Sequence, residues 1–250
     1  MPSTPRTVCG GRSCSFVSLY ATGNGPRDTC VETINRRRMK RVYVFSGLGA
    51  DERVFQYLDF SGFAVTFVRW LQPLQNETIE EYAKLLTKQI VTVRPILIGL
   101  SFGGIVATEV AKLIDTEKII LVASAKTRQE IPFYYRLVGQ LRLHKLLPVD
   151  LLKQPNVLSN WFFGVHSQSD KKMLVAILRD TDSQFLRWAI DKIVTWRNQF
   201  VHPNLTHIHG TADRILPFRY VMSDLQVTGG GHFMTVNKAQ ELTAAIRSLL

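Results

Sequence analysis

A serine between two glycines, set between a strand-like and a helix-like segment, most restricts how this chain can fold. Gly99-Leu-Ser-Phe-Gly103 matches the pattern G-x-S-x-G. The apolar run Pro95–Leu100 predicts a strand before it, and Gly104–Leu113 predicts a helix after it. A serine on so tight a turn needs glycine at both flanking positions, because larger side chains would clash across the turn. The turn would lift the hydroxyl above a sheet, which makes Ser101 the candidate nucleophile.

From Arg41 onward, strand-like and helix-like segments alternate. Thr78-Ile-Glu-Glu81 has the form of a capping box, and it predicts a helix that continues to about Val91. Alternation of this kind predicts an α/β fold, with a mostly parallel sheet covered by helices on both faces. The other predicted elements are strands at Val42–Phe45, Phe63–Trp70, Lys118–Ser124, Leu205–His209 and Leu225–Thr228, and a closing helix at about Asn237–Leu250.

One region interrupts this alternation. Residues of about 125–203 contain no good strand pattern and read as several helices, so we expect a helical cap inserted between two strands of the sheet. The region is rich in aromatic residues. They would either line an apolar substrate pocket or simply pack the cap onto the rest of the domain. The aromatic positions are Phe133-Tyr134-Tyr135, Trp161-Phe162-Phe163, Trp188 and Trp196.

A serine hydroxyl is a poor nucleophile at neutral pH and needs a base, which in turn needs an orienting acid. When the serine sits on such a turn, the acid and then the histidine follow it along the chain. Asp213 follows one late strand and His232 follows the last strand, so they are the candidate acid and base. Asp224 is a weaker candidate because it begins a strand, and His209 could shape the Asp213 loop. Surface or packing roles are expected for His144, His166, His202 and His207.

The chemistry also needs two donors aimed at the oxygen that becomes negative. One candidate is the amide of Phe102, directly after the nucleophile. The other is the amide of Leu48, in the loop after the first strand, where Gly47 or Gly49 could serve instead. Ser46 in the same loop could itself donate to a substrate.

Residues 1–38 differ in composition from the rest of the chain. They are rich in Gly, Pro, Ser, Thr and Arg, and we expect a disordered or non-native tail before a domain at residues 39–250. The three cysteines, Cys9, Cys14 and Cys30, all lie in this tail. A domain without cysteine fits a reducing compartment, so the expected location is the cytoplasm.

The formal net charge of +11 raises the question of an anionic partner. Residues 1–38 carry six arginines and two acids, which places +4 of the charge in the tail. The remaining +7 is spread over residues 39–250 and reads as solvated surface charge. We therefore expect no nucleic-acid partner and no stable membrane association, while the oligomeric state stays open.

No cofactor or metal is expected. Gly47-Leu48-Gly49 follows a strand as a dinucleotide-binding loop would, but Glu52 stands where the third glycine belongs. An acid is also missing about 20 residues further on, where Arg69 is found. The sequence contains neither a phosphate-binding lysine loop nor a His/Cys spacing typical of metal sites.

Taken together, these residues resemble the α/β-hydrolase superfamily over about Arg41–Leu250, and Gly47–Phe55 is similar to the start of small bacterial hydrolases of this kind. The resemblance implies a compact variant with six parallel strands and a cap. It also implies a carboxylesterase-like serine hydrolase, acting through an acyl-enzyme on a small to medium apolar ester. Thioester, lactone, carbon–carbon and peptide substrates remain open, as does a ligand-binding protein with little turnover.

Overall fold

The computed structural model describes residues 39–146, 148, 153 and 157–250; the tail predicted at residues 1–38 lies outside the described residues. In the described part of the chain, six parallel strands form one sheet in the order β2-β1-β3-β4-β5-β6. The fold class predicted from the sequence is confirmed. The strands are β1 (Arg41–Phe45), β2 (Ala64–Phe67), β3 (Ile96–Leu100), β4 (Lys118–Val122), β5 (Leu205–Gly210) and β6 (Leu225–Val227).

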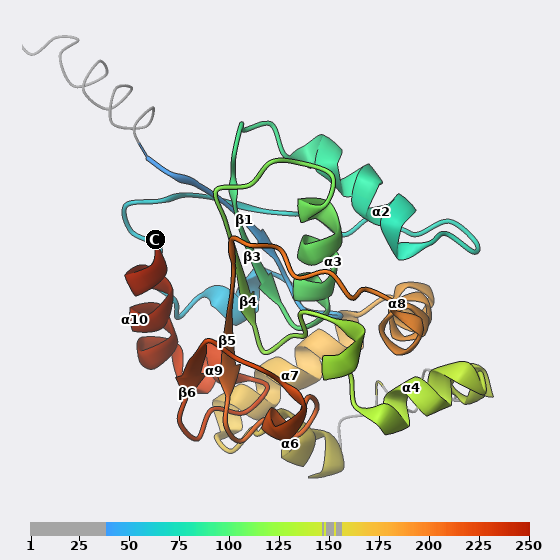
Figure 1. Cartoon of the computed structure of the whole chain (residues 1–250). Helices are drawn as coiled ribbons and strands as arrows, with labels where there is room; N and C mark the ends of the chain where they lie inside the picture. Colours follow the sequence, from blue (N-terminus) through green and yellow to red (C-terminus); the bar gives the residue numbers. More distant parts are fainter. Residues whose placement is uncertain (1–38, 147, 149–152, 154–156) are drawn as a thin grey trace, which may run out of the picture. The chain divides into compact units, whose positions relative to one another are not determined.

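Both faces of the sheet are buried, which explains why its central strands are continuous apolar runs. In β1, Tyr43 and Phe45 belong to the core on one face, and Val42 and Val44 to the core on the other. Helices α2 and α3 cover the first face, and α9 and α10 contribute to the second; α3 and α10 lie on opposite sides of the sheet in Figure 1. These helices are α2 (Ile79–Leu86), α3 (Phe102–Ala111), α9 (Met234–Asn237) and α10 (Ala239–Leu249).

The capping box predicted from the sequence is present at the start of α2. The Thr78 side chain accepts a hydrogen bond from the Glu81 amide at 3.2 Å, and the Glu81 carboxylate accepts one from the Thr78 amide at 2.9 Å. Two amides without partners inside the helix are thereby satisfied. The α-helix ends at Leu86 and continues only as the short 3-10 helix η2 (Thr87–Gln89), so the predicted extension to Val91 is wrong.

Two other predicted boundaries also differ from the structure. The strand predicted at Phe63–Trp70 spans only Ala64–Phe67, because beyond it the Trp70 side chain turns inward and hydrogen-bonds Ser46. The closing helix predicted at about Asn237–Leu250 is present as α10, but it begins two residues later and a further short helix, α9, ends at Asn237. Lys238 separates the two helices by a non-helical backbone conformation with φ −133° and ψ 32°. In both places a tertiary contact or a local turn overrides the periodic pattern.

Several helices lie between β4 and β5, where the sequence predicts an inserted cap; this segment is called the cap below. Its last long helix is anchored on the core: the Trp188 ring lies 4.5 Å from the Tyr82 ring and 6.0 Å from the Phe102 ring, between centroids. Trp188 therefore packs the cap onto the domain. In Figure 1, α4, α6 and α7 lie below the sheet. The inserted elements are η3 (Arg128–Glu130), α4 (Phe133–Gln140), η4 (Leu143–Leu146), α6 (Val157–Phe163), α7 (Gln168–Asp180) and α8 (Ser183–Thr195).

Candidate active site

Ser101 occupies the strained turn that its glycine neighbours predict. Its backbone has φ 52° and ψ −120°, a region that residues other than glycine rarely adopt. A Cβ on Gly99 would overlap the Gly104 backbone, and one on Gly103 would overlap the carbonyls of Phe45 and Ser46. The turn is held to the neighbouring strand by a 2.9 Å hydrogen bond from the Ser101 amide to the Val122 carbonyl. The hydrogen bond to the neighbouring strand thus helps to hold Ser101 in its strained conformation.

Loops at the carboxyl ends of three strands bring Ser101, His232 and Asp213 together. His232 Nε2 lies 2.8 Å from Ser101 Oγ, and His232 Nδ1 lies 2.8 Å from Asp213 Oδ2. Both distances suit hydrogen bonds, with the serine hydroxyl donating to Nε2 and Nδ1–H donating to the carboxylate. His232 and Asp213 are buried, while Ser101 is half-buried and reachable. This arrangement can pass a proton from the serine to the imidazole.

Asp213 is fixed by its own loop. Its Oδ1 accepts hydrogen bonds from the amides of Ile215 and Leu216, each at 2.9 Å, which leaves Oδ2 for His232. Burial alone would raise the pKa of Asp213, but the nearby His232 and these hydrogen bonds outweigh it, and the pKa is lowered from 3.8. The carboxylate is therefore ionised near neutral pH. The rival Asp224 instead accepts a hydrogen bond from the His207 amide, at the other end of the sheet.

The lowered pKa of Asp213 predicts a pH effect on stability. A carboxyl whose folded pKa is below its unfolded value of about 3.9 contributes stability above that value, and the contribution is lost as pH falls through the folded pKa. Between pH 6 and about pH 3, the free energy of unfolding should therefore fall more steeply for the wild type than for Asp213→Asn. Urea unfolding at several pH values measures this. Asp115→Asn, at an exposed position, is the control, and equal slopes for the wild type and Asp213→Asn would contradict the prediction.

The loop after β1 lies beside the nucleophile. A Cβ on Gly47 would stand 3.6 Å from the Ser101 Cβ, in ordinary contact. The two amides predicted as oxyanion donors, those of Leu48 and Phe102, have no acceptor among the described residues. They are thus free to bind a substrate oxygen. Ser46 Oγ accepts a 2.8 Å hydrogen bond from the Trp70 indole, which leaves its own proton available.

The cap touches this loop directly, a contact that the sequence pattern did not predict. The Thr181 hydroxyl lies 3.4 Å from the Gly49 carbonyl, and a Cβ on Gly49 would overlap the Thr181 side chain. Arg53 bridges Asp51 at 2.8 Å and Asp180 at 3.0 Å, joining the loop to the end of α7. The cap therefore helps to position the segment that carries Leu48.

Two further side chains lie around the triad, of which only His209 was suggested by the sequence. The Phe163 ring of the cap lies edge-on to His232, with 5.8 Å between centroids. His209 donates from Nε2 to the Leu216 carbonyl at 2.8 Å, and so braces the Asp213 loop as the sequence suggested. Burial lowers the pKa of His209, which keeps this imidazole neutral. The run of aromatics at 161–163 was the available signal for Phe163, but it did not show which ring faces the site.

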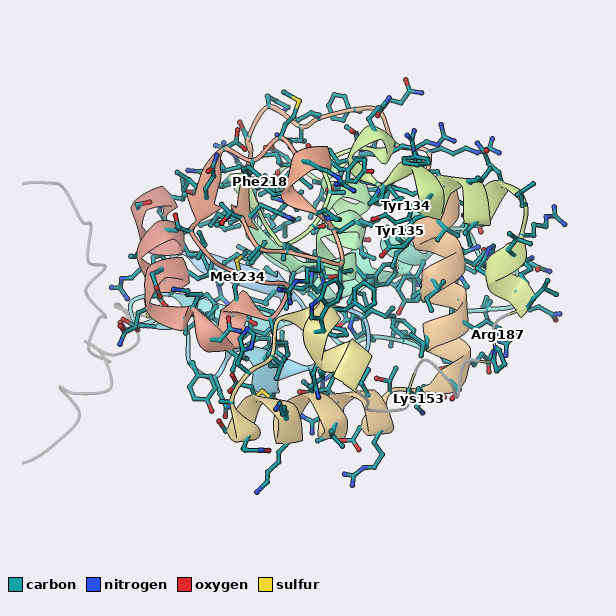
Figure 2. The ribbon with its side chains drawn as sticks, turned by 90° about the horizontal axis from the view of Figure 1, so that it is seen from below. Tyr134, Tyr135, Lys153, Arg187, Phe218 and Met234 are labelled. Carbon is teal, nitrogen blue, oxygen red and sulfur yellow. The ribbon has the colours of Figure 1, made fainter. Side chains whose placement is uncertain are left out.

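Apolar side chains come from the loops beside the site and from the cap. Leu48, Tyr135 and Ile215 are partly buried against the core beneath the α3 face. Figure 2 shows Tyr134 and Tyr135 extending from α4 toward the middle of the domain. Burial raises the pKa of Tyr135 to about 12, so its hydroxyl stays protonated at neutral pH.

In the part of the chain that the structure describes, no group of three or more His, Cys, Asp and Glu side chains could hold a metal ion. None of the described helices has the length and apolar character needed to cross a membrane.

Comparison with protein families gives the same fold. The model of the alpha/beta hydrolase family matches residues 23–245. The chain belongs to the α/β-hydrolase family. Among curated proteins, none matches its sequence.

Solved structures resemble this α/β hydrolase at low sequence identity. A bromoperoxidase from Bacillus anthracis is 16% identical, with 84% of this chain and 91% of that chain covered and a TM-score of 0.60. An esterase from Exiguobacterium antarcticum is 15% identical, with coverage of 84% and 91% and a TM-score of 0.57. Est816, an N-acyl homoserine lactone degrading enzyme, is 12% identical, with coverage of 84% and 93% and a TM-score of 0.62. At these identities the likeness concerns the fold.

Proposed function

We propose that this α/β hydrolase is a serine hydrolase that cleaves carboxylic esters of small to medium apolar substrates. The observation that carries the proposal is the continuous hydrogen-bonded series Ser101–His232–Asp213, with 2.8 Å at each step. The esterase and the lactone-degrading enzyme among its structural neighbours support hydrolysis of a carboxylic ester bond. The partly buried side chains of Leu48, Tyr135 and Ile215 support an apolar substrate.

The proposed reaction proceeds in two halves. His232 Nε2 takes the proton from Ser101 Oγ as the oxygen attacks the ester carbonyl, and the carbonyl oxygen becomes negative between the amides of Leu48 and Phe102. Asp213 holds His232 in the correct tautomer and stabilises its charged form. His232 then gives its proton to the leaving alcohol, which leaves an acyl group on Ser101. In the second half His232 activates water, which releases the acid and restores the serine.

A cavity of about 410 Å³ lies beside the loop that carries the proposed oxyanion donor. Apolar residues such as Phe67, Val68 and Trp70 line one part of it. The rest of the lining is polar or charged and includes Ser46, Asp51, Glu52, Arg53 and Arg69. Ser101 is not part of its lining, so we propose that the cavity accommodates a substrate chain rather than the reacting carbonyl. A cavity of this size fits the small end of ligand pockets, which span about 300–1,000 Å³.

A panel of p-nitrophenyl esters, from acetate to octanoate, tests the proposal, extended by one thioester, one lactone and one proline anilide. We expect turnover of at least one ester, with Ser101→Ala inactive on all of them. Turnover of the thioester, the lactone or the anilide without any ester would replace the proposed bond type. No turnover of any compound would contradict an enzyme and favour a ligand-binding protein.

A further inference from the structure

A second cavity, of about 170 Å³, lies behind the loops that carry the acid and the base of the triad. Three segments form it: the cap loop before α7, the loop after β5 and the segment from β6 to α10. Neither Ser101 nor another residue of the triad lines it. Since water occupies about 30 Å³ per molecule, the space holds a ligand of several heavy atoms.

The ionisable side chains that line this cavity are all basic. They are His166 from the cap loop, Arg214 from the loop after β5, and Lys238 from the start of α10. No acid belongs to the lining. Lys238 pairs with Glu241 at 3.0 Å, at a side chain that is 54% exposed and thus in water. Groups that come from three separate segments and converge on one small space favour a ligand of opposite charge.

Among these basic side chains, Arg214 is the strongest candidate to bind an anion. Its Nη1 donates to the Trp161 carbonyl at 2.7 Å, and its guanidinium lies over the Trp161 ring, 4.5 Å from the centroid. These contacts orient the group without neutralising it, and no carboxylate of the described residues is within ion-pair distance of it. The adjacent Asp213 uses both oxygens for His232 and two backbone amides. A fixed guanidinium with spare donors is suited to bind an oxyanion in bidentate fashion.

Glycine residues also line this second cavity, where no side chain covers their backbone. Gly164 and Gly231 both line the cavity, and a Cβ on Gly231 would stand only 3.3 Å from the Gly164 Cα. The Gly231 amide has no acceptor in the described part of the chain, so it is free to donate. Asn237 joins the two segments by donating to the Gly164 carbonyl at 2.9 Å. Free amides of glycine-rich loops are common ligands of phosphate groups.

From this convergence of basic side chains, of which Arg214 has no acidic partner among the described residues, with the free Gly231 amide, we propose that the cavity is a binding site for a phosphate-type oxyanion. The ligand is either inorganic phosphate or the phosphate group of a small monoester. It bridges the cap, through His166, to Arg214 in the loop that carries Asp213 and to Lys238 at the start of α10. Because Gly231 precedes His232 and Arg214 follows Asp213, binding rigidifies the backbone that carries the acid and the base. The site does not depend on which bond the enzyme cleaves.

Thermal unfolding of the full chain tests this site, with inorganic phosphate and glycerol phosphate as probes at constant ionic strength. At ligand concentrations above the dissociation constant, each tenfold increase in the concentration of a probe that binds should raise Tm by about 3–5 °C. Arg214→Gln and Lys238→Gln should each weaken the effect at least about tenfold, the cost of one charged hydrogen bond. The probe that binds more tightly identifies the source of the phosphate group.

Arg219→Gln is the matched control. Arg219 lies over the Tyr220 ring at 5.1 Å, as Arg214 lies over Trp161, but it does not line the cavity. The control should respond to phosphate as the wild type does. The proposal is overturned if neither probe shifts Tm, or if the shift is equal in the wild type, Arg214→Gln and Lys238→Gln. Either outcome leaves the ester hydrolysis assay unaffected, so the two proposals fail separately.

Discussion

His232→Ala should lower kcat/KM for a nitrophenyl ester by about 10⁴-fold or more, because the members of such a triad act as a unit. Without the imidazole, Ser101 has no base, and Asp213 has nothing to orient. The measurement is the steady-state rate on the ester that the wild type turns over fastest. The residual rate should equal that of Ser101→Ala, since either change removes the same step.

His202→Ala serves as the control for this prediction. His202 lies near the start of β5, where its Nδ1 accepts a hydrogen bond from the Asn204 amide, far along the strand from the reacting groups. Its kcat/KM should stay within about twofold of the wild type, as for a surface change. If His232→Ala loses less than about tenfold, another residue is the base.

Gly103→Ala should destabilise the fold by about 3 kcal/mol or more, the upper end of the range for overpacking. The new Cβ would overlap the carbonyls of Phe45 and Ser46, which belong to β1 and the loop after it. These atoms are backbone, so no side-chain rotation can relieve the overlap. Moving them would also displace the loop that carries Leu48, and activity should fall together with stability. Urea unfolding measures the first effect and ester turnover the second.

Gly47→Ala is the matched control for stability. A Cβ at Gly47 would find its nearest neighbours at 3.6–3.7 Å, which is ordinary contact, and its φ is not in the left-handed region. Its free energy of unfolding should stay within about 1 kcal/mol of the wild type. Equal stability of Gly103→Ala and Gly47→Ala would show that the turn tolerates a side chain, against the close packing described above.

The parts of the site that the sequence predicts are those that local pattern and strand order determine. The glycines at positions 99 and 103 indicate Ser101 as the nucleophile. Asp213 and His232 follow from their places after the last two strands, because the carboxyl ends of parallel strands meet at one edge of a sheet. These three positions needed no knowledge of packing between distant segments.

The parts that the sequence does not predict depend on long-range packing. Thr181 lies 132 residues from Gly49 yet occupies the space above it, and nothing in either segment indicates the other. Phe163 is one of three adjacent aromatics, and only the course of the cap loop decides that it faces His232. Trp70 also lies outside the strand predicted for it, and its indole donates a hydrogen bond to Ser46, in a loop that is distant in sequence.

A fluorophosphonate probe tests the central claim most directly, because it reacts with an activated serine whatever the natural substrate is. Intact-protein mass spectrometry should show one added phosphonyl group on the wild type, and peptide mapping should place it on Ser101. Ser101→Ala should remain unlabelled, and His232→Ala should label far more slowly than the wild type. Labelling of Ser101→Ala at the wild-type rate, or a modified residue other than Ser101, would contradict the account.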